Sequence, residues 1–240
     1  MKHVREFIPQ KEDKILIVSP HPDDETLGCG GLIIKYHEQV DILLLSAGEE
    51  DDDPDELIRK KKKRLSEFES ALSVAGRVHC VTSLDLPLYG IKRNKHIIRS
   101  VSIRDYQYVF VPHRREHHPD HKCLYRLFLN MMRKQNRKAT LIEYESTTAL
   151  QNLYYYVDLS MPEMIVRKKR MMNSYESQIA GFNYEGIHIG LSMYQGALVH
   201  KEYVEAFYRV PTFYRLKQIY ALSPVIVKRI IEKIYAKMKK

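Results

Sequence analysis

Two short polar segments of the sequence share a motif that is suited to holding a metal ion. The first is PHPDDE at residues 20–25, and the second is HHPDH at residues 117–121. A catalytic zinc site typically takes three ligands from His, Asp or Glu and leaves one position open for water. His21 and Asp24 lie three residues apart and can bind one ion together, while His121 can complete the site from the second segment. The spacing therefore predicts a metal centre with the ligands His21, Asp24 and His121.

The neighbouring acidic and histidine side chains fit the remaining tasks of a hydrolytic site. Asp23 stays uncoordinated beside the ion and can accept a proton from water, whose pKa the ion lowers. His118 lies one turn from His121 and can protonate a leaving amine or stabilise a tetrahedral oxyanion. Asp120 can orient a ligand histidine from behind. A single His-x-x-Asp or His-x-x-His is more often a turn or capping feature, so this interpretation depends on HPD occurring twice.

Each motif follows a segment with the pattern of a buried strand. The apolar run at residues 14–19 (KILIVS) ends at Pro20, and the run at 106–111 precedes the second motif. Similar patterns predict strands at 40–45, 78–82, 140–145 and 154–159, and helices at 26–38, 54–75, 95–103, 124–132 and 162–178. This alternation indicates the α/β class, with a mainly parallel sheet and helices on both faces. Ligands bind such sheets at the carboxyl ends of strands, so we expect the two motifs to meet.

Taken together, the two motifs resemble the LmbE/PIG-L family of metal-dependent N-deacetylases. Weaker similarities to the family occur at SAGE (46–49), RLSEFESALSVAG (64–76), Asp85, KKRMMNSYESQ (168–178) and YVEAF (203–207). The resemblance spans about residues 14–208, and it is specific mainly at the two histidine motifs. It implies a Rossmann-like fold and the hydrolysis of N-acetylglucosaminyl compounds with Zn²⁺, Fe²⁺ being the alternative metal.

By position, the resemblance implies the same three ligands and adds further roles. It makes Asp23 the general base and His118 the acid or the electrophilic histidine. It also makes Arg64 and Glu49 candidate sugar contacts, although plain surface charges are an equal alternative. Some relatives have a tyrosine two residues before the first histidine of HPDH, which assists the oxyanion, and here that position is Glu116. Either another tyrosine supplies this help or the chain does without it.

Length and charge divide the chain into a body and a tail. The chain has 240 residues, 44% of them apolar, which suffices for one α/β domain, expected at residues 1–210. The net charge of +9 is concentrated in residues 211–240, which hold eight Lys or Arg and a single Glu. Apolar residues recur at helical spacing in this tail at Val227, Ile230, Ile231, Ile234 and Met238. A basic amphipathic helix can rest on an anionic membrane, and the open alternative is that its apolar stripe packs on the domain or on another subunit.

The N-terminus and the cysteines indicate a cytoplasmic protein. Residues 1–14 lack the apolar core of a signal peptide, and no run approaches the roughly 18 apolar residues of a membrane-spanning helix. Cys29, Cys80 and Cys123 are odd in number and have no CxxC spacing, which argues against a disulfide framework. We therefore expect a cytoplasmic location, with peripheral contact at the inner membrane face through the tail.

The glycines in GCGG at residues 28–31 do not predict a dinucleotide-binding loop. They do not fit GxGxxG, and they begin inside a predicted helix, so we expect them to pack closely against the sheet. We also expect Cys29 to be a buried side chain rather than a nucleophile, because buried cysteines are commoner than reactive ones and no histidine is tied to Cys29 by sequence.

These features favour a zinc-dependent hydrolase that removes the N-acetyl group from an N-acetylglucosamine-type sugar conjugate in glycoconjugate biosynthesis. The expected partner is a small-molecule N-acetylated amino-sugar conjugate. The alternatives are another metal-dependent amide or ester hydrolase with the same site, and a non-catalytic sugar- or membrane-binding relative. Nucleic-acid binding is disfavoured because the positive surplus is confined to the tail. The sequence leaves the oligomeric state open.

Overall fold

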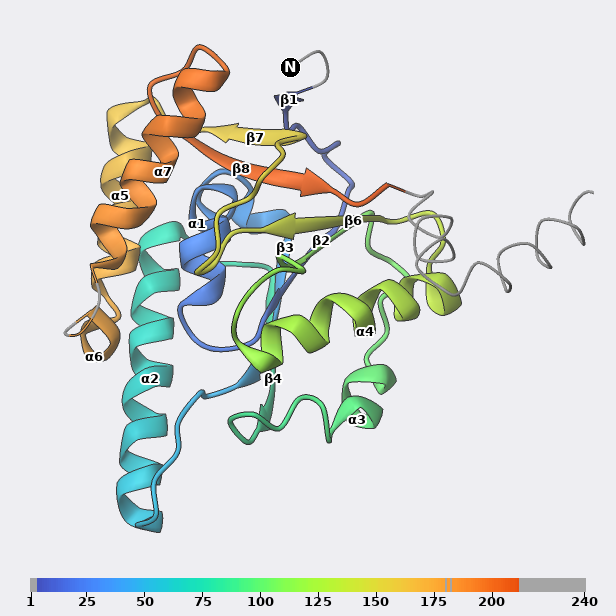
Figure 1. Cartoon of the computed structure of the whole chain (residues 1–240), viewed down its shortest axis with the longest axis vertical. Coiled ribbons are helices and arrows are strands. Elements are labelled where there is room, and N and C mark those ends of the chain that lie inside the picture. The colour runs from blue at the N-terminus through green and yellow to red at the C-terminus, as the bar shows by residue number, and fades with distance from the viewer. Residues whose placement is uncertain (1–3, 180, 182, 212–240) are drawn as a thin grey trace, which may run out of the picture. The chain divides into compact units, whose positions relative to one another are not determined.

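The apolar runs of the body form one eight-stranded sheet within residues 4–179, 181 and 183–211, the part of the chain that the computed structural model describes. The strands lie in the order β1-β7-β8-β6-β5-β2-β3-β4 (Figure 1). They are β1 (Arg5–Glu6), β2 (Ile15–Ser19), β3 (Val40–Ser46), β4 (Cys80–Leu86), β5 (Tyr108–Pro112), β6 (Thr140–Tyr144), β7 (Tyr155–Asp158) and β8 (Val204–Arg209). In this sheet β8 is antiparallel to β6 and β7, and the other paired strands are parallel.

Helices cover both faces of this sheet. They are α1 (Asp24–Tyr36), the 3-10 helix η1 (His37–Gln39), α2 (Pro54–Ala75), α3 (Lys95–Ser100), α4 (Pro119–Gln135), α5 (Pro162–Asn173), α6 (Glu176–Ile179) and α7 (Tyr184–Leu198). Figure 1 shows α1, α2, α5 and α7 on one side of the sheet and α3 and α4 on the other. Helix α5 packs on α1 and α2, while α4 packs on β5. The predicted fold class, a mainly parallel α/β sheet with helices on both faces, is therefore confirmed.

Several element boundaries follow directly from capping residues. The side chain of Asp53 accepts a hydrogen bond from the backbone N–H of Asp55 (2.9 Å), and Pro54 occupies the first turn of α2. Gly76 ends this helix with a φ of 108°, a conformation that favours glycine. The predicted helix at 54–75 thus has the observed bounds.

Other elements differ from the prediction for identifiable reasons. The helix expected at 124–132 begins at Pro119, because proline is well tolerated at the first helical position and His118 caps the helix. The helix expected at 162–178 is divided into α5 and α6 at residues 174–175, where the side chain of Tyr175 is buried in the core. The strand expected at 78–82 lies at 80–86, and α7 and β8 were not predicted.

The order of the strands reverses between β2 and β5. These two strands are parallel neighbours in the sheet, but the chain continues from β2 to β3 on one side and from β5 to β6 on the other. Open α/β sheets bind ligands at such a topological switch point, beyond the carboxyl ends of the strands. PHPDDE follows β2 and HHPDH follows β5, so both histidine motifs lie at this position.

The glycines of α1 allow this helix to approach the sheet and its neighbours closely. A Cβ atom at Gly28 would overlap the ring of Tyr144, and one at Gly31 would overlap the side chain of Leu159. Cys29 between them is buried, and burial raises the pKa of its thiol well above the ordinary value. The GCGG segment therefore serves close packing, as expected, and its thiol is not activated.

A buried ion pair joins the middle of α1 to two distant elements. Lys168 of α5 donates to the carbonyl of Leu27 (3.2 Å) and pairs with Glu205 of β8. The Glu205 carboxylate in turn accepts the backbone N–H groups of Gly31 and Leu32, each at 2.9 Å. This network therefore ties α1 to α5 and β8.

By its internal contacts the chain divides into two units, Met1–Arg209 and Val210–Lys240. The amphipathic tail predicted at 211–240 lies, from residue 212 onward, outside the described residues. Among the helices of the described part, none is long and apolar enough to cross a membrane.

Candidate metal centre

Three side-chain atoms from the two histidine motifs form a compact triangle. His21 Nδ1 lies 3.4 Å from His121 Nε2 and 3.4 Å from Asp24 Oδ2, and His121 Nε2 lies 3.2 Å from Asp24 Oδ2. Zinc binds nitrogen and oxygen ligands at roughly 2.0–2.2 Å, so tetrahedral geometry separates two ligand atoms by about 3.3–3.5 Å. The triangle therefore has the dimensions of three corners of a tetrahedral site. The structure brings all three predicted ligands together, in a buried position.

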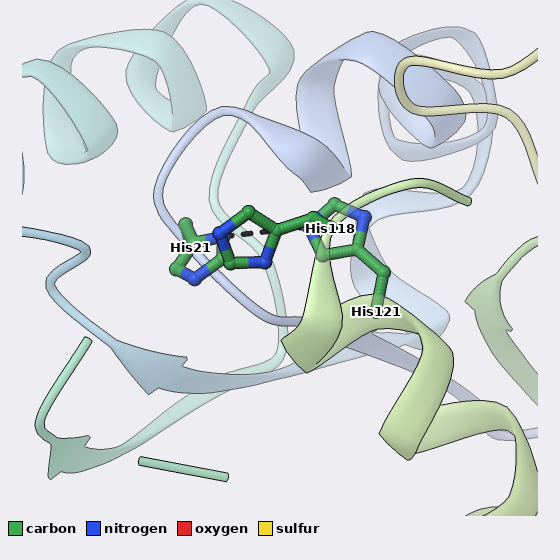
Figure 2. A group of neighbouring side chains, drawn as sticks. All are labelled: His21, His118 and His121. Carbon is green, nitrogen blue, oxygen red and sulfur yellow. Dashed lines mark hydrogen bonds between the residues drawn. The ribbon is translucent and has the colours of Figure 1, made fainter. Parts of the chain in front are cut away.

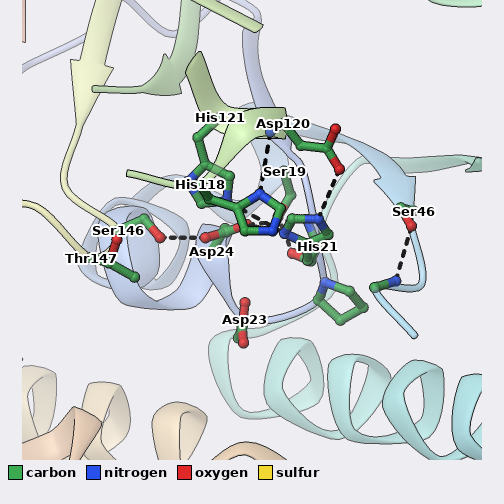
Figure 3. Close-up of polar contacts among 12 residues, drawn as sticks. Ser19, His21, Asp23, Asp24, Ser46, His118, Asp120, His121, Ser146 and Thr147 are labelled. Atoms are coloured by element: carbon green, nitrogen blue, oxygen red, sulfur yellow. Dashed lines mark hydrogen bonds and ion pairs between the residues drawn. The ribbon is translucent and has the colours of Figure 1, made fainter. Parts of the chain in front are cut away.

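The local fold fixes each of these three side chains. Asp24 is the first residue of α1, and its Oδ2 accepts the backbone N–H of His21 (3.1 Å). Its other oxygen, Oδ1, accepts the hydroxyl of Ser146 in the loop after β6 (Figure 3). His121 lies in the first turn of α4. The ligand atoms thus depend on the starts of two helices and on one further loop.

The second nitrogen of each ligand histidine faces a carboxylate. His21 Nε2 lies 3.5 Å from Asp120 Oδ2, and His121 Nδ1 lies 4.0 Å from Glu116 Oε2. Among the described residues, His21 Nε2, His121 Nδ1 and Asp120 Oδ2 have no hydrogen-bond partner although they are buried. Histidine ligands of metals usually donate their second N–H to a carboxylate, a carbonyl or water. The predicted orienting residue, Asp120, lies behind His21.

Electrostatics at the triangle favour a positive charge. Burial acts to lower the pKa of His21, but Asp120 and Asp24 outweigh burial and raise that pKa to about 9. For His121, burial also acts to lower the pKa, but Asp24 outweighs burial and the pKa is raised. Burial acts against the charge of Asp24, but His121 and His21 hold its pKa well below the usual range. A site that stabilises positive charge at these rings is suited to a divalent cation.

His118 lies beside the triangle and is held at the start of α4. Its Nδ1 accepts the backbone N–H of Asp120 (3.3 Å), and its ring stacks on Tyr89 with centroids 5.1 Å apart. The ring centroid lies 4.7 Å from that of His21. Burial, followed by the positive charges of His21 and His121, lowers the pKa of His118 to about 4.

The three histidine rings form a second set of candidate ligands. His21, His118 and His121 each offer a nitrogen within 4.8 Å of the other two (Figure 2). The triangle with Asp24 is tighter, because its longest edge is 3.4 Å, and His118 already uses Nδ1 as the cap of α4. We therefore favour Asp24 over His118 as the third ligand.

Asp23, the predicted general base, has surroundings unlike those of its neighbour Asp24. Its φ of 128° is a strained value for a non-glycine residue. Its carboxylate pairs with Arg64 Nη2 at 3.1 Å, and Figure 3 shows Asp23 set apart from the histidine rings. Burial and the charge of Asp24 raise the pKa of Asp23 to about 7, while Arg64 opposes this shift. A carboxyl group with a pKa near neutrality is suited to exchanging protons with water.

Arg64 and Glu49, the predicted sugar contacts, bind each other. Arg64 is buried, so it is not a surface charge. It donates to the carbonyls of Pro22 and Gly48 and to Glu49 Oε1 (3.3 Å), in addition to its bond with Asp23. The guanidinium group therefore ties the PHPDDE loop to the SAGE turn after β3. A direct contact with substrate stays a prediction for both residues.

Several residues of this region were missed in the sequence. The hydroxyl of Tyr175 donates to Glu25 (2.5 Å), which also contacts the hydroxyl of Ser19 (2.9 Å). Burial, followed by the charges of Asp23 and Asp24, raises the pKa of Tyr184 to about 12, so this tyrosine of α7 lies near the site. The resemblance to the family at KKRMMNSYESQ was the available signal for Tyr175. No signal was available for Tyr184, since α7 itself was not predicted.

Comparison with known proteins finds one family model that covers both histidine motifs. Residues 16–132 match the family model described as PIG-L: GlcNAc-PI de-N-acetylase, a segment that includes both histidine motifs. No curated protein sequence matches the chain.

Solved structures share the fold at low sequence identity. The conserved protein TT1542 from Thermus thermophilus is 22% identical with a TM-score of 0.68, covering 83% of this chain and 95% of its own. The N,N'-diacetylchitobiose deacetylase from Pyrococcus horikoshii is 20% identical with a TM-score of 0.68, covering 89% and 88%. GalB, the 4-carboxy-2-hydroxymuconate hydratase from Pseudomonas putida, is 16% identical with a TM-score of 0.61, covering 83% and 96%. These similarities establish the fold of the described part.

Proposed function

Because the chain contains a PIG-L family domain over residues 16–132, we propose that it is a metal-dependent deacetylase that hydrolyses the N-acetyl group of an N-acetylglucosamine-type sugar conjugate. The observation that carries the proposal is the ligand triangle at the switch point of the sheet, with edges of 3.2–3.4 Å. The name of the Pyrococcus horikoshii protein, a deacetylase of an acetylated sugar, supports the same substrate class.

His21, Asp24 and His121 hold the metal, which we propose to be Zn²⁺, with Fe²⁺ as the alternative. Two neutral imidazoles and one carboxylate suit either ion. Bound there, the ion supplies Lewis acidity toward the amide carbonyl and lowers the pKa of water. The orphaned buried nitrogens of His21 and His121, seen among the described residues, support ligand roles for the opposite nitrogen of each ring.

Asp23 accepts the proton of the attacking water and returns it to the leaving amine. Its raised pKa, about 7, suits both directions of transfer. His118 stabilises the oxyanion of the tetrahedral intermediate. Because Nδ1 of His118 accepts the N–H of Asp120 (3.3 Å), the proton of the neutral ring lies on Nε2, which is then a donor.

Two alternative functions are compatible with the same fold. The similarity to GalB, a hydratase, means that the fold alone does not select deacetylation. The closest alternative is another metal-dependent amide or ester hydrolase with the same site. The second alternative is a non-catalytic sugar- or membrane-binding relative, which predicts binding without turnover and an Asp23→Asn variant that functions normally.

The test combines metal analysis with an acetate-release screen of the purified full-length protein. We expect stoichiometric zinc or iron, and acetate release from N-acetylglucosaminyl compounds. Release from simple acetamides or esters, but from no sugar, would support the other hydrolase instead. A protein that holds no stoichiometric metal and releases acetate from none of these compounds would contradict the proposal.

We also propose that the basic segment at 211–240 contacts an anionic membrane surface peripherally, on the cytoplasmic side. This proposal is supported by the eight basic residues and the apolar residues at helical spacing in the segment. Such a contact would bring the site to conjugates that are presented at a membrane.

A further inference from the structure

Glu116 is a buried carboxylate that no prediction assigned to a task. It lies in the loop between β5 and α4, and its exposed fraction is 0%. Its Oε1 accepts the backbone N–H groups of Ser146 (3.2 Å), Thr147 (3.2 Å) and Thr148 (3.1 Å). Its Oε2 accepts the hydroxyl of Thr147 at 2.6 Å. Four donors in the protein interior therefore fix this carboxylate in one position.

The loop that Glu116 holds reaches the candidate metal centre. Ser146, the first residue bonded to Glu116, donates its hydroxyl to Asp24 Oδ1 (Figure 3). The opposite oxygen of Asp24 is the corner of the ligand triangle. Glu116 thus fixes the residue that orients one ligand.

The second oxygen of Glu116 faces another ligand directly. Glu116 Oε2 lies 4.0 Å from His121 Nδ1, while His121 Nε2 forms a corner of the triangle. Within the described part of the chain, His121 Nδ1 is buried without a hydrogen-bond partner. Asp120 occupies the corresponding place behind His21, at 3.5 Å. Each ligand histidine therefore has a carboxylate at its second nitrogen.

We propose that Glu116 is a positioning residue of the metal centre, which orients Asp24 through Ser146 and places a negative charge behind His121. A negative charge behind a ligand imidazole favours the proton on the ring nitrogen that faces it, so that the opposite nitrogen is free to bind the metal. This inference rests on the proposed metal-dependent function. It assigns a task to the position at which some relatives are expected to have a tyrosine.

Glu116→Gln separates this task from simple loop support. The amide oxygen of glutamine can still accept the three backbone N–H groups, and its NH₂ can donate to the Thr147 hydroxyl, so the loop keeps its hydrogen bonds. The negative charge behind His121 is lost. Glu143→Gln is the matched control, because Glu143 is also a buried carboxylate that accepts a backbone N–H, that of Arg114 (3.0 Å).

The measurement is the dissociation constant of the metal-free full-length protein for Zn²⁺, by competition with a chromophoric chelator, together with its free energy of unfolding without metal. We expect Glu116→Gln to bind Zn²⁺ about 10–100-fold more weakly than the parent chain. Glu143→Gln is expected to bind Zn²⁺ within about twofold of the parent chain, since the bonds of Glu143 go to Arg114 rather than to a ligand of the triangle. A role in loop support alone would leave both the Zn²⁺ affinity and the free energy of unfolding of Glu116→Gln close to those of the parent chain, because the loop keeps its hydrogen bonds.

Ser146→Ala is the second variant, and it tests the Asp24 arm if Glu116→Gln does not fold. It removes the hydroxyl on Asp24 Oδ1 and is expected to weaken Zn²⁺ binding as well. The inference about Glu116 is overturned if Glu116→Gln binds Zn²⁺ as tightly as the parent chain. If only Ser146→Ala folds, unchanged Zn²⁺ affinity in that variant overturns it. The proposed function stands in either case. If the parent chain itself binds no Zn²⁺ or Fe²⁺, the proposed function fails first.

Discussion

Adjacent residues of the PHPDDE motif have different surroundings although both are buried aspartates. Asp24 begins α1 and contacts His21 and His121, which hold its pKa low against the effect of burial. Asp23 contacts Arg64 instead, and burial raises its pKa to about 7. One carboxylate is thus suited to binding a cation, and the other is suited to exchanging a proton.

Asparagine at each of these two positions should therefore have a different effect. Asp24→Asn removes the charge that faces two ligand histidines, so we expect the purified variant to lose its metal and its activity together. Asp23→Asn is expected to keep its metal and to lose about 10²–10⁴-fold in kcat, the usual contribution of a general base. Metal analysis and acetate-release kinetics on both variants check this pair. If Asp23→Asn lost its metal and Asp24→Asn kept it, Asp23 would be the ligand and Asp24 the general base.

The pH dependence of activity depends on Arg64, because its positive charge lowers the pKa of Asp23 against burial. A general base acts only when it is ionised, so activity rises as the pH rises through its pKa. In Arg64→Gln that pKa is higher, and we expect the rise of kcat/KM to move to higher pH. Arg59→Gln, on the exposed side of the same helix, serves as the control with an unchanged profile. A profile that moves to lower pH in Arg64→Gln would contradict this role of Arg64.

Elements differ in how far the sequence predicts them. The bounds of α2 are predictable because Asp53, Pro54 and Gly76 act through the local backbone. Helix α7 is not, since Gly186, Gly190 and Gly196 weaken the helical pattern and packing on β8 outweighs this intrinsic preference.

The same distinction applies to the candidate site. Parallel strands carry both histidine motifs to one edge of the sheet, so the meeting of His21 with His121 is predictable. The hydrogen bond of Tyr175 with Glu25 joins residues 150 positions apart, and that of Glu116 with Ser146 joins residues 30 apart. Such pairs depend on tertiary packing, which residue types and local spacing do not specify.

The buried pair of Lys168 with Glu205 stabilises the contact between α5, α1 and β8. Lys168→Met leaves the Glu205 carboxylate buried without its cation and the Leu27 carbonyl without its donor. We expect the free energy of unfolding to fall by about 3–5 kcal/mol in denaturant titrations. Lys169→Met removes the neighbouring exposed pair with Glu185 (3.5 Å). This substitution should change the free energy of unfolding by only about 0–1 kcal/mol. Equal effects of the two substitutions would show that the buried pair has no special part in this packing.

Close packing of α1 gives a second prediction at the scale of elements. Gly31→Ala places a methyl group against Leu159, so we expect a loss of about 1–3 kcal/mol in the free energy of unfolding. At Gly190 in α7, a Cβ would meet no atom of the described residues within 4 Å. Gly190→Ala is therefore expected to stabilise the protein by about 0.5–1 kcal/mol, because alanine loses less backbone entropy in a helix. Thermal or chemical unfolding tests this prediction: the change in the free energy of unfolding should have opposite signs in the two variants.

For the whole molecule, the fold sets the place of the site but does not select its chemistry. A deacetylase and a hydratase share this fold at TM-scores of 0.68 and 0.61. The switch point between β2 and β5 is a property of strand order, whereas the triangle and its two carboxylates are properties of particular side chains. Substrate choice therefore depends on the loops around the switch point and on whatever brings the substrate to it.

At the scale of the full chain, we predict that the basic segment at 211–240 binds anionic membranes. Replacing Lys228, Lys233 and Lys237 by Gln removes three charges that are each worth about 1 kcal/mol at an anionic surface. We expect the variant to bind anionic vesicles roughly 100-fold more weakly in co-sedimentation, since 1.4 kcal/mol corresponds to a factor of ten. The parent chain should also bind neutral vesicles, or anionic vesicles at high salt, more weakly, because both conditions remove the electrostatic attraction. If the apolar stripe instead packs on the body or on a second copy, the 1–210 chain loses stability or changes its oligomeric state while vesicle binding stays equal in all forms.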